Sequence, residues 1–111
     1  MVYVLGELAD ARRGKVKADL AMLNGAMTHY AINNGGRYPE SLQVLTEAGP
    51  NGGAFVTNAK SLMDPWDHTY LYEKGEDVGE LRIYTLGRDG EPGGEGEDLD
   101  IDQVMVLQDE V

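Results

Sequence analysis

The strongest constraint on the fold is an apolar stripe with helical spacing along residues 5–32. The stripe consists of residues that recur at alternating steps of four and three, namely Val16, Leu20, Leu23, Met27 and Tyr30. This spacing gathers the apolar side chains on one face of an α-helix, and such a face must be buried against another element. We therefore predict a long amphipathic helix over residues 5–32 that forms the spine of the fold and packs on a sheet.

The opposite face of this helix is polar, and the helix contains two interior glycines, Gly14 and Gly25. Each glycine costs about 1 kcal/mol relative to alanine in a helix, so we expect a close neighbour at both positions. A cluster of basic side chains is interpreted as a solvated surface: Arg12, Arg13, Lys15 and Lys17.

A connecting region, residues 33–63, follows the helix. Asparagine and glycine at residues 33–36 favour a helix stop, because both residue types accept left-handed backbone geometry. Residues 39–48 are predicted to form a short second helix, and residues 49–53 indicate a loop rich in glycine. The inward side chains of the short helix are predicted to be Leu42 and Leu45.

The last part of the chain, residues 64–111, predicts a small antiparallel sheet. Residues 69–73 and 80–86 favour strands, and the glycine- and acid-rich turn between them at 75–79 would join them into a hairpin. The apolar run at 104–107 is typical of an edge strand. One long helix followed by a small sheet indicates the α+β fold class.

The composition fits a single domain over residues 1–111, because a hydrophobic content of 41% supports one modest core. The chain contains no cysteine, which excludes disulfides and thiolate metal sites. No run approaches the roughly 18 apolar residues that span a bilayer. Residues 1–10 also lack the basic start and apolar middle of a secretory signal.

The net charge of −11 is concentrated at the C-terminal end of the chain. From residue 89 to 111 there are nine acidic side chains and no lysine or arginine. Such a surface opposes binding to nucleic acid and to anionic membranes, since affinity for phosphate backbones depends on cationic groups.

Residues 86–100 combine acidic side chains with many glycines. Calcium is bound by six to eight oxygens from carboxylates and main-chain carbonyls, and glycines allow a loop to curl around one centre. A solvated acidic tail has the same composition, so composition alone leaves both interpretations open. The helix–loop–helix type of calcium motif is excluded, because Gln103 occupies the position that needs glycine.

Signals of catalysis are weak, and we predict that the chain is not an enzyme. Ser41 and Ser61 lie outside any nucleophile motif, and His29 and His68 lack the paired spacing of a zinc site. The late carboxylates could in principle form an acid and base pair, but no substrate cleft is indicated around them.

Three blocks of residues carry a resemblance to a known family. They are residues 34–39 (Asn-Gly-Gly-Arg-Tyr-Pro), residues 64–66 (Asp-Pro-Trp) with Tyr70 and Tyr72, and residues 85–101. The last block begins Thr-Leu-Gly-Arg-Asp-Gly and ends Asp-Leu-Asp-Ile. On these blocks the chain resembles the major pseudopilin of type II secretion systems, the general secretion pathway protein G family.

The resemblance implies a pseudopilin head of the type IV pilin-like fold, with Ca²⁺ bound by the loop at residues 86–100. Carried over by position, the calcium ligands are the backbone carbonyls of Leu86 and of a residue near Glu91, and the carboxylates of Asp89 and of either Asp98 or Asp100. Residues 67–69 depart from the glycine-containing turn that the family commonly has, while the loop is intact.

The resemblance also implies a mechanical function. Copies would assemble helically into a periplasmic pseudopilus, together with other pseudopilins and inner-membrane components of the secretion system. Family members begin with a leader and an apolar half-helix that anchors them in the inner membrane, so we interpret residues 1–10 as a start inside the long helix. A type IV pilin or minor pilin of a motility or adhesion system is the first alternative, and an unrelated calcium-binding or carbohydrate-active module is the second.

Overall fold

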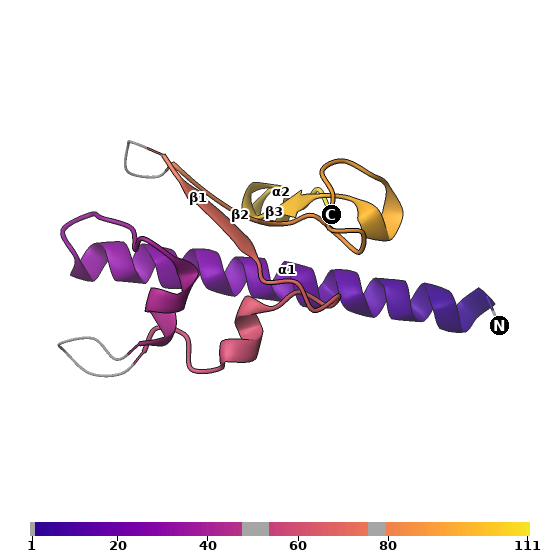
Figure 1. The fold of residues 1–111 in the computed structure, drawn as a ribbon, viewed down its shortest axis with the longest axis horizontal. Coiled ribbons are helices and arrows are strands. Elements are labelled where there is room, and N and C mark those ends of the chain that lie inside the picture. The colour runs from indigo at the N-terminus through magenta and orange to yellow at the C-terminus, as the bar shows by residue number, and fades with distance from the viewer. Residues whose placement is uncertain (1, 48–53, 76–79) are drawn as a thin grey trace.

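The structure is a computed structural model that describes residues 2–47, 54–75 and 80–111. The molecule is elongated, with principal dimensions of 51 × 27 × 22 Å. Its long axis follows one helix, and the remaining elements lie against that helix along its length (Figure 1). Among the described residues, no helix is both long enough and apolar enough to cross a membrane.

Helix α1 (Val2–Asn33) confirms the predicted spine. Four residues of the predicted stripe are completely buried, which confirms the face that the spacing indicated: Val16, Leu20, Leu23 and Met27. The helix ends at Asn33, just before two glycines with positive φ. Gly35 adopts a φ of +69°, and the N–H of Gly36 donates to the carbonyl oxygen of Ala31 at 2.8 Å, which is the closure expected of a glycine-terminated helix.

The three strands form one antiparallel sheet in the order β1-β2-β3. The strands are β1 (Leu71–Lys74), β2 (Leu81–Thr85) and β3 (Ile101–Asp102). The first two form the predicted hairpin, in which Leu71 lies opposite Tyr84. Of the predicted turn at residues 75–79, residues 76–79 lie outside the described part of the chain.

The core lies between α1 and the inner face of this sheet. Ile83, the central inward residue of β2, is completely buried, as are the four stripe residues of α1 named above. The sheet and α2 (Gln103–Leu107) lie along one side of α1, and two short 3-10 helices lie along the other side in the same view (Figure 1). The sheet, α2 and the two 3-10 helices thus cover the apolar face of α1.

The 3-10 helices are η1 (Leu42–Thr46) and η2 (Ala59–Leu62). The first confirms the predicted short helix, and its Leu42 and Leu45 side chains are buried as expected. The second falls in a stretch for which the sequence predicts no element. The predicted loop at residues 49–53 lies outside the described part of the chain.

The predicted edge strand at residues 104–107 is wrong, because these residues belong to helix α2. The Asp102 side chain caps this helix by accepting a hydrogen bond from the N–H of Met105 at 3.0 Å. The side-chain amide of Gln103 then forms the hydrogen bonds with β2 that the backbone of a longer β3 would have formed. Its Oε1 accepts from the N–H of Ile83 at 2.8 Å, and its Nε2 donates to the carbonyl oxygen of Leu81 at 2.6 Å.

The explanation expected for Gly14 and Gly25 is also wrong. A Cβ atom added at either position would meet nothing within 4 Å outside the neighbouring turns of the helix. Both residues lie on the exposed side of α1, where the neighbouring small residues are exposed as well: Ala11, Ala18 and Ala21. No contact within the described protein therefore requires glycine at these two positions.

Candidate metal-binding loop

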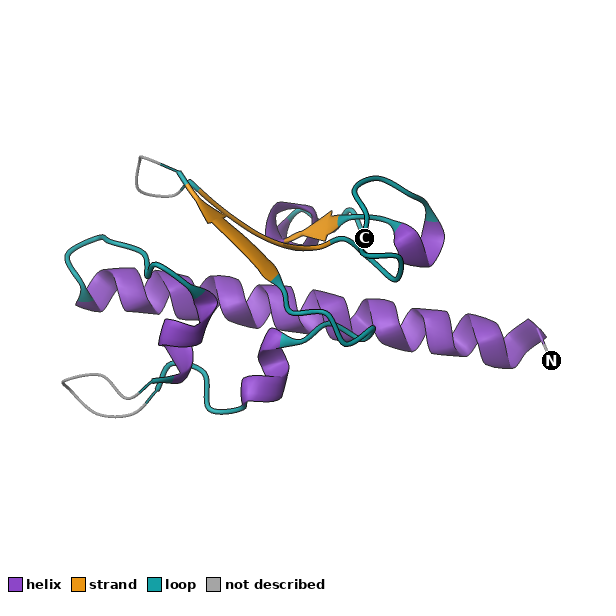
Figure 2. Cartoon of the chain, viewed as in Figure 1, coloured by secondary structure: helices purple, strands orange, loops and turns teal. Residues whose placement is uncertain are grey.

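The loop predicted to bind a metal, residues 86–100, joins β2 to β3. It contains the 3-10 helix η3 (Gly96–Asp98) and lies beside the N-terminal half of α1 (Figure 2). Two glycines allow it to close on itself. A Cβ on Gly87, whose φ is +81°, would lie 2.6 Å from the carbonyl carbon of Asp98, and one on Gly94 would lie 2.5 Å from the carbonyl oxygen of Asp98. The start and the middle of the loop therefore pack on the Asp98 backbone.

A chain of hydrogen bonds connects the start of this loop to a buried carboxylate. The Asp64 side chain accepts from the N–H groups of Trp66 at 3.0 Å and His68 at 2.9 Å. The hydroxyl of Thr85 donates to the other Asp64 oxygen at 2.7 Å and accepts from the N–H of Gly87 at 3.1 Å. The turn at residues 64–68 thereby fixes the end of β2 and the first residues of the loop.

The predicted ligands all lie in this one loop, but they do not form a cluster of carboxylates. Leu86 is half-buried directly after β2, whereas Asp89 and Glu91 are exposed. Asp89 Oδ1 accepts from the N–H of Glu91 at 3.1 Å. Within the described residues, no group of three or more histidine, cysteine, aspartate or glutamate side chains could hold a metal ion.

The two late aspartates have different surroundings. Both oxygens of Asp98 are occupied by the guanidinium of Arg88, through Nε at 3.1 Å and Nη2 at 3.3 Å. Asp100 Oδ2 accepts from the N–H of Gly93 at 2.9 Å. Asp100 Oδ1 is buried and has no hydrogen-bond partner among the described residues. Of the two aspartates, Asp100 is the one with an oxygen available to a ligand.

Two arginines contact the loop, and sequence reasoning missed this role. Arg88 also approaches Glu97 Oε2 through Nη1 at 3.4 Å, while Arg12 of α1 donates to Glu97 Oε1 at 2.8 Å. Hydrogen bonding to Asp98 raises the pKa of the Arg88 side chain. The interpretation of the basic cluster as solvated is therefore wrong for Arg12, whose partner is 85 positions away in sequence. No local pattern could have indicated it.

Lys15 is exposed, as expected of the basic cluster, and it also donates to Asp19 Oδ2 and to the carbonyl oxygen of Met63 at 2.7 Å. The same Asp19 oxygen accepts from the hydroxyl of Tyr70 at 2.7 Å. Lys15 therefore attaches the connecting region to α1, and Asp19 attaches the residue before β1.

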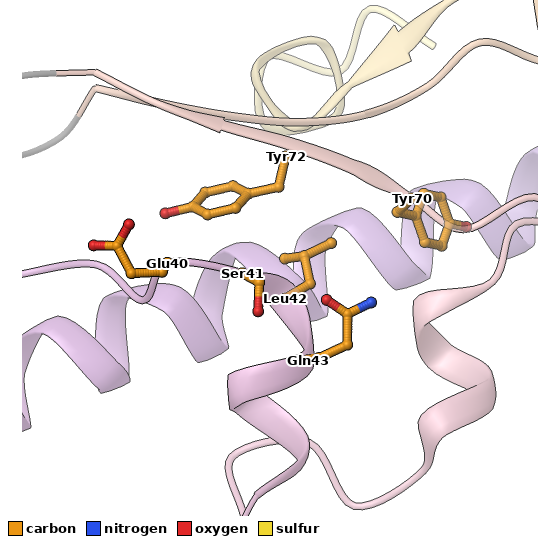
Figure 3. Close-up of a pocket in the computed structure, with 6 residues that line it drawn as sticks. All are labelled: Glu40, Ser41, Leu42, Gln43, Tyr70 and Tyr72. Atoms are coloured by element: carbon orange, nitrogen blue, oxygen red, sulfur yellow. The ribbon is translucent and has the colours of Figure 1, made fainter.

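A pocket of about 190 Å³ lies between η1 and the start of β1 (Figure 3). It is lined by Glu40, Ser41, Leu42, Gln43, Tyr70 and Tyr72. The tyrosine hydroxyls are already engaged, since Tyr70 donates to Asp19 and Tyr72 donates to the carbonyl oxygen of Pro39 at 2.8 Å. Burial raises the pKa of both, that of Tyr72 to about 12, so both stay protonated at neutral pH. Neither tyrosine is a candidate base or nucleophile.

A long helix packed on a small antiparallel sheet, with a closed loop before the last strand, defines the class of pilin-like heads. The family model described as "Type II secretion system (T2SS), protein G" matches residues 3–104. The type II secretion system core protein G of Xanthomonas campestris pv. campestris is 34% identical over 100 residues, which cover 85% of this chain and 69% of that protein. The corresponding protein of Vibrio cholerae serotype O1 is 32% identical over 108 residues, covering 88% and 72%.

A solved structure agrees with the sequence comparisons. The crystal structure of the major pseudopilin from the type 2 secretion system of enterohaemorrhagic Escherichia coli superposes with a TM-score of 0.65 at 25% identity. The match covers 88% of this chain and 90% of that one. The chain belongs to the type II secretion system protein G family, the major pseudopilins, which are structural and non-enzymatic subunits of a protein-transport system.

Proposed function

We propose that this pseudopilin is a calcium-stabilised head that assembles with copies of itself into a periplasmic filament and assists the export of folded proteins across the outer membrane. An N-terminal apolar half-helix would anchor the full-length protein in the inner membrane, where other pseudopilins and inner-membrane components are its further partners. The single observation that supports the calcium part is Asp100 Oδ1, which is buried in a glycine-rich loop and has no hydrogen-bond partner among the residues that the structure describes.

The residues of the loop fit calcium in their chemistry. Asp100 and Asp89 would supply carboxylate oxygens, and the backbone carbonyls of Leu86 and of a residue near Glu91 would supply neutral oxygens, a mixture that calcium prefers. A buried carboxylate oxygen without a partner is unfavourable by itself. A bound divalent cation would compensate that oxygen and would reduce the repulsion between the acidic side chains of the loop.

Thermal denaturation tests this proposal, because a ligand that binds only the native state raises its stability. The wild-type chain is melted in excess chelator, in millimolar calcium and in millimolar magnesium. We expect a calcium-selective rise of the melting temperature, which Asp100→Asn and Asp89→Ala abolish and the exposed control Asp109→Asn retains. An unchanged calcium shift in Asp100→Asn would contradict the assignment of Asp100.

The outer face of α1 supports assembly with further copies. Small residues line this face at successive turns and are exposed: Ala11, Gly14, Ala18, Ala21 and Gly25. Small side chains let two helices approach closely, and the absence of a partner for Gly14 and Gly25 within the described protein fits a contact made between copies. Ile32 on α1, seven positions after Gly25, is 74% exposed as well.

The chain contains no cysteine, so a thiol introduced into it is a specific label. In the full-length protein expressed with its secretion system, the thiol of Ala18→Cys is expected to react more slowly with a maleimide in assembled filaments than in the isolated head. Lys60→Cys, which is exposed on η2, serves as the control and should react at the same rate in both states. Protection of Lys60→Cys alone would place the contact on a different surface.

A further inference from the structure

We propose that Arg88 and Arg12 hold the turn formed by Glu97 and Asp98 in the shape that a cation requires, so that Asp98 is a positioning residue and not a calcium ligand. This inference rests on the proposed calcium site and adds two residues that the sequence did not assign to it. The four side chains are called the arginine clamp below.

Arg88 contacts the turn through its backbone and its side chain together. Its N–H donates to the carbonyl oxygen of Glu97 at 2.7 Å, while its guanidinium contacts Asp98 through two nitrogens at 3.1 and 3.3 Å. Two parallel contacts from one planar guanidinium fix the orientation of a carboxylate as well as its distance. The Asp98 carboxylate is thereby directed at arginine, with both oxygens engaged.

Arg12 extends the clamp to the long helix. Its guanidinium binds Glu97 Oε1 at 2.8 Å, and the other oxygen of Glu97 faces Arg88 at 3.4 Å. The Glu97 side chain is 19% exposed, so this carboxylate lies partly out of water between two positive charges. Through Glu97, the loop is attached to α1 by a contact that the backbone alone does not provide.

The clamp separates the acidic side chains of the loop into two groups. Glu97 and Asp98 are neutralised by arginine, whereas Asp89 and Asp100 have no arginine contact in the structure described. The repulsion that opposes loop closure is therefore reduced before any cation binds. The glycines at positions 87 and 94 pack on the Asp98 backbone, so the same turn that the clamp fixes also sets the position of the start and the middle of the loop.

Substitution of Arg88 has two opposite effects that the experiment must separate. Loss of its positive charge would favour a nearby cation, while loss of its two-pronged contact would let the turn move. Arg88→Lys keeps the charge and removes the planar pair of donors. This variant therefore reports on positioning alone, and Asp98→Asn and Asp100→Asn test the two aspartates directly.

Calcium titration calorimetry is carried out at a temperature where every variant is folded by circular dichroism. We expect Arg88→Lys and Asp98→Asn to weaken binding by about two- to fivefold, the scale of one partly exposed ion pair, and Asp100→Asn to show no binding. If Arg88→Lys bound calcium with wild-type affinity, the proposed positioning role of the arginine clamp would be wrong. Complete loss of binding in Asp98→Asn would make Asp98 a ligand and would also overturn it.

The contact with α1 has a matched control in the neighbouring arginine. Arg12→Gln and Arg13→Gln remove the same charge from adjacent positions, but only Arg12 contacts Glu97. We expect Arg12→Gln to weaken calcium binding by about twofold or more and Arg13→Gln to leave it unchanged. Equal affinities in the two variants would show that Arg12 does not position the loop.

Amide hydrogen exchange in excess chelator keeps the clamp testable apart from the calcium site. If the wild-type chain bound no calcium, the proposed calcium site would be wrong. We would still expect the loop amides to exchange faster in Arg88→Lys than in wild type, because the contact between Arg88 and Asp98 does not depend on calcium. Unchanged exchange across residues 87–100 would overturn the clamp whether or not calcium binds.

Discussion

At the scale of single residues, Gln103 shows how one side chain completes a sheet. Its amide pairs with the backbone of Ile83 and Leu81, the positions that a longer β3 would have used. The side chain is buried, with 3% of its residue surface exposed, so water cannot replace these hydrogen bonds. The short β3 is sufficient because Gln103 continues its pairing.

Replacing Gln103 should therefore destabilise the protein more than its size suggests. Gln103→Leu keeps the volume but leaves a buried N–H and a buried carbonyl without partners, which costs about 1–3 kcal/mol for each such group. Urea denaturation of the variant measures the loss in the free energy of unfolding. Gln108→Leu changes an exposed glutamine and should stay close to wild type; similar losses in both variants would contradict the pairing role of Gln103.

Two glycines should respond in opposite directions to the same substitution. Gly25→Ala is expected to raise the free energy of unfolding by about 1 kcal/mol, because the site is open and helical. Gly87→Ala is expected to lower it, since the φ of +81° and the Asp98 backbone at 2.6 Å leave no room for Cβ. Urea denaturation of both variants measures the difference, and a destabilised Gly25→Ala would mean that the helix has a partner there within the head.

At the scale of elements, the two faces of α1 should differ in how they tolerate truncation. Leu20→Ala removes a completely buried side chain and should cost about 2–5 kcal/mol. Met22→Ala changes a side chain that is 36% exposed on the outer face and should cost less than about 1 kcal/mol in the isolated head. Denaturant unfolding of both variants measures the contrast, and equal losses would show that the outer face is covered.

The elements differ in how well the sequence predicted them, and the reason is physical. Periodicity places Leu20 and Met27 correctly, because a helix of this length repeats its pattern many times. The run at 104–107 is too short for that, and its conformation is decided by the Asp102 cap and by the pairing of Gln103 with a strand some twenty positions earlier. The cap is local, but the pairing of Gln103 with β2 is a long-range contact that local sequence does not show.

The loop was predicted in part for the same reason. Its glycines and acidic residues allow both a closed loop and a solvated tail, and the close backbone packing at Gly87 and Gly94 shows that the loop is closed. The ligand assignment stays a prediction. Whether Asp98 or Asp100 is available depends on which carboxylate Arg88 contacts, and the composition of the loop does not determine that choice.

At the scale of the whole molecule, stability should fall at high pH. Burial raises the pKa of Tyr72 from an ordinary value of 10 to about 12, and burial with the hydrogen bond to Asp19 raises that of Tyr70 further. The native state holds these protons to higher pH than the unfolded chain does, so their contribution is fully present below pH 10 and is lost as the pH rises towards 12.

Urea denaturation between pH 8 and about 11.5 measures this effect through the linkage between proton binding and stability. The free energy of unfolding should be level near pH 8 and decline above pH 10. Tyr72→Phe should make the decline shallower, because one of the tyrosines whose pKa is raised is then absent. An equally steep decline in that variant would contradict the contribution of Tyr72.

The Gln103 amide also limits how the protein can associate with other chains. An exposed strand edge can recruit a strand from a neighbour and lead to aggregation, but here the edge of β2 beyond β3 is occupied by a side chain of the same molecule. The opposite edge of the sheet is β1, which carries the charged Glu73 and Lys74 and is unattractive to a hydrophobic strand. The described edges of the sheet are therefore poor sites for association, which is consistent with the proposed assembly through the outer face of α1.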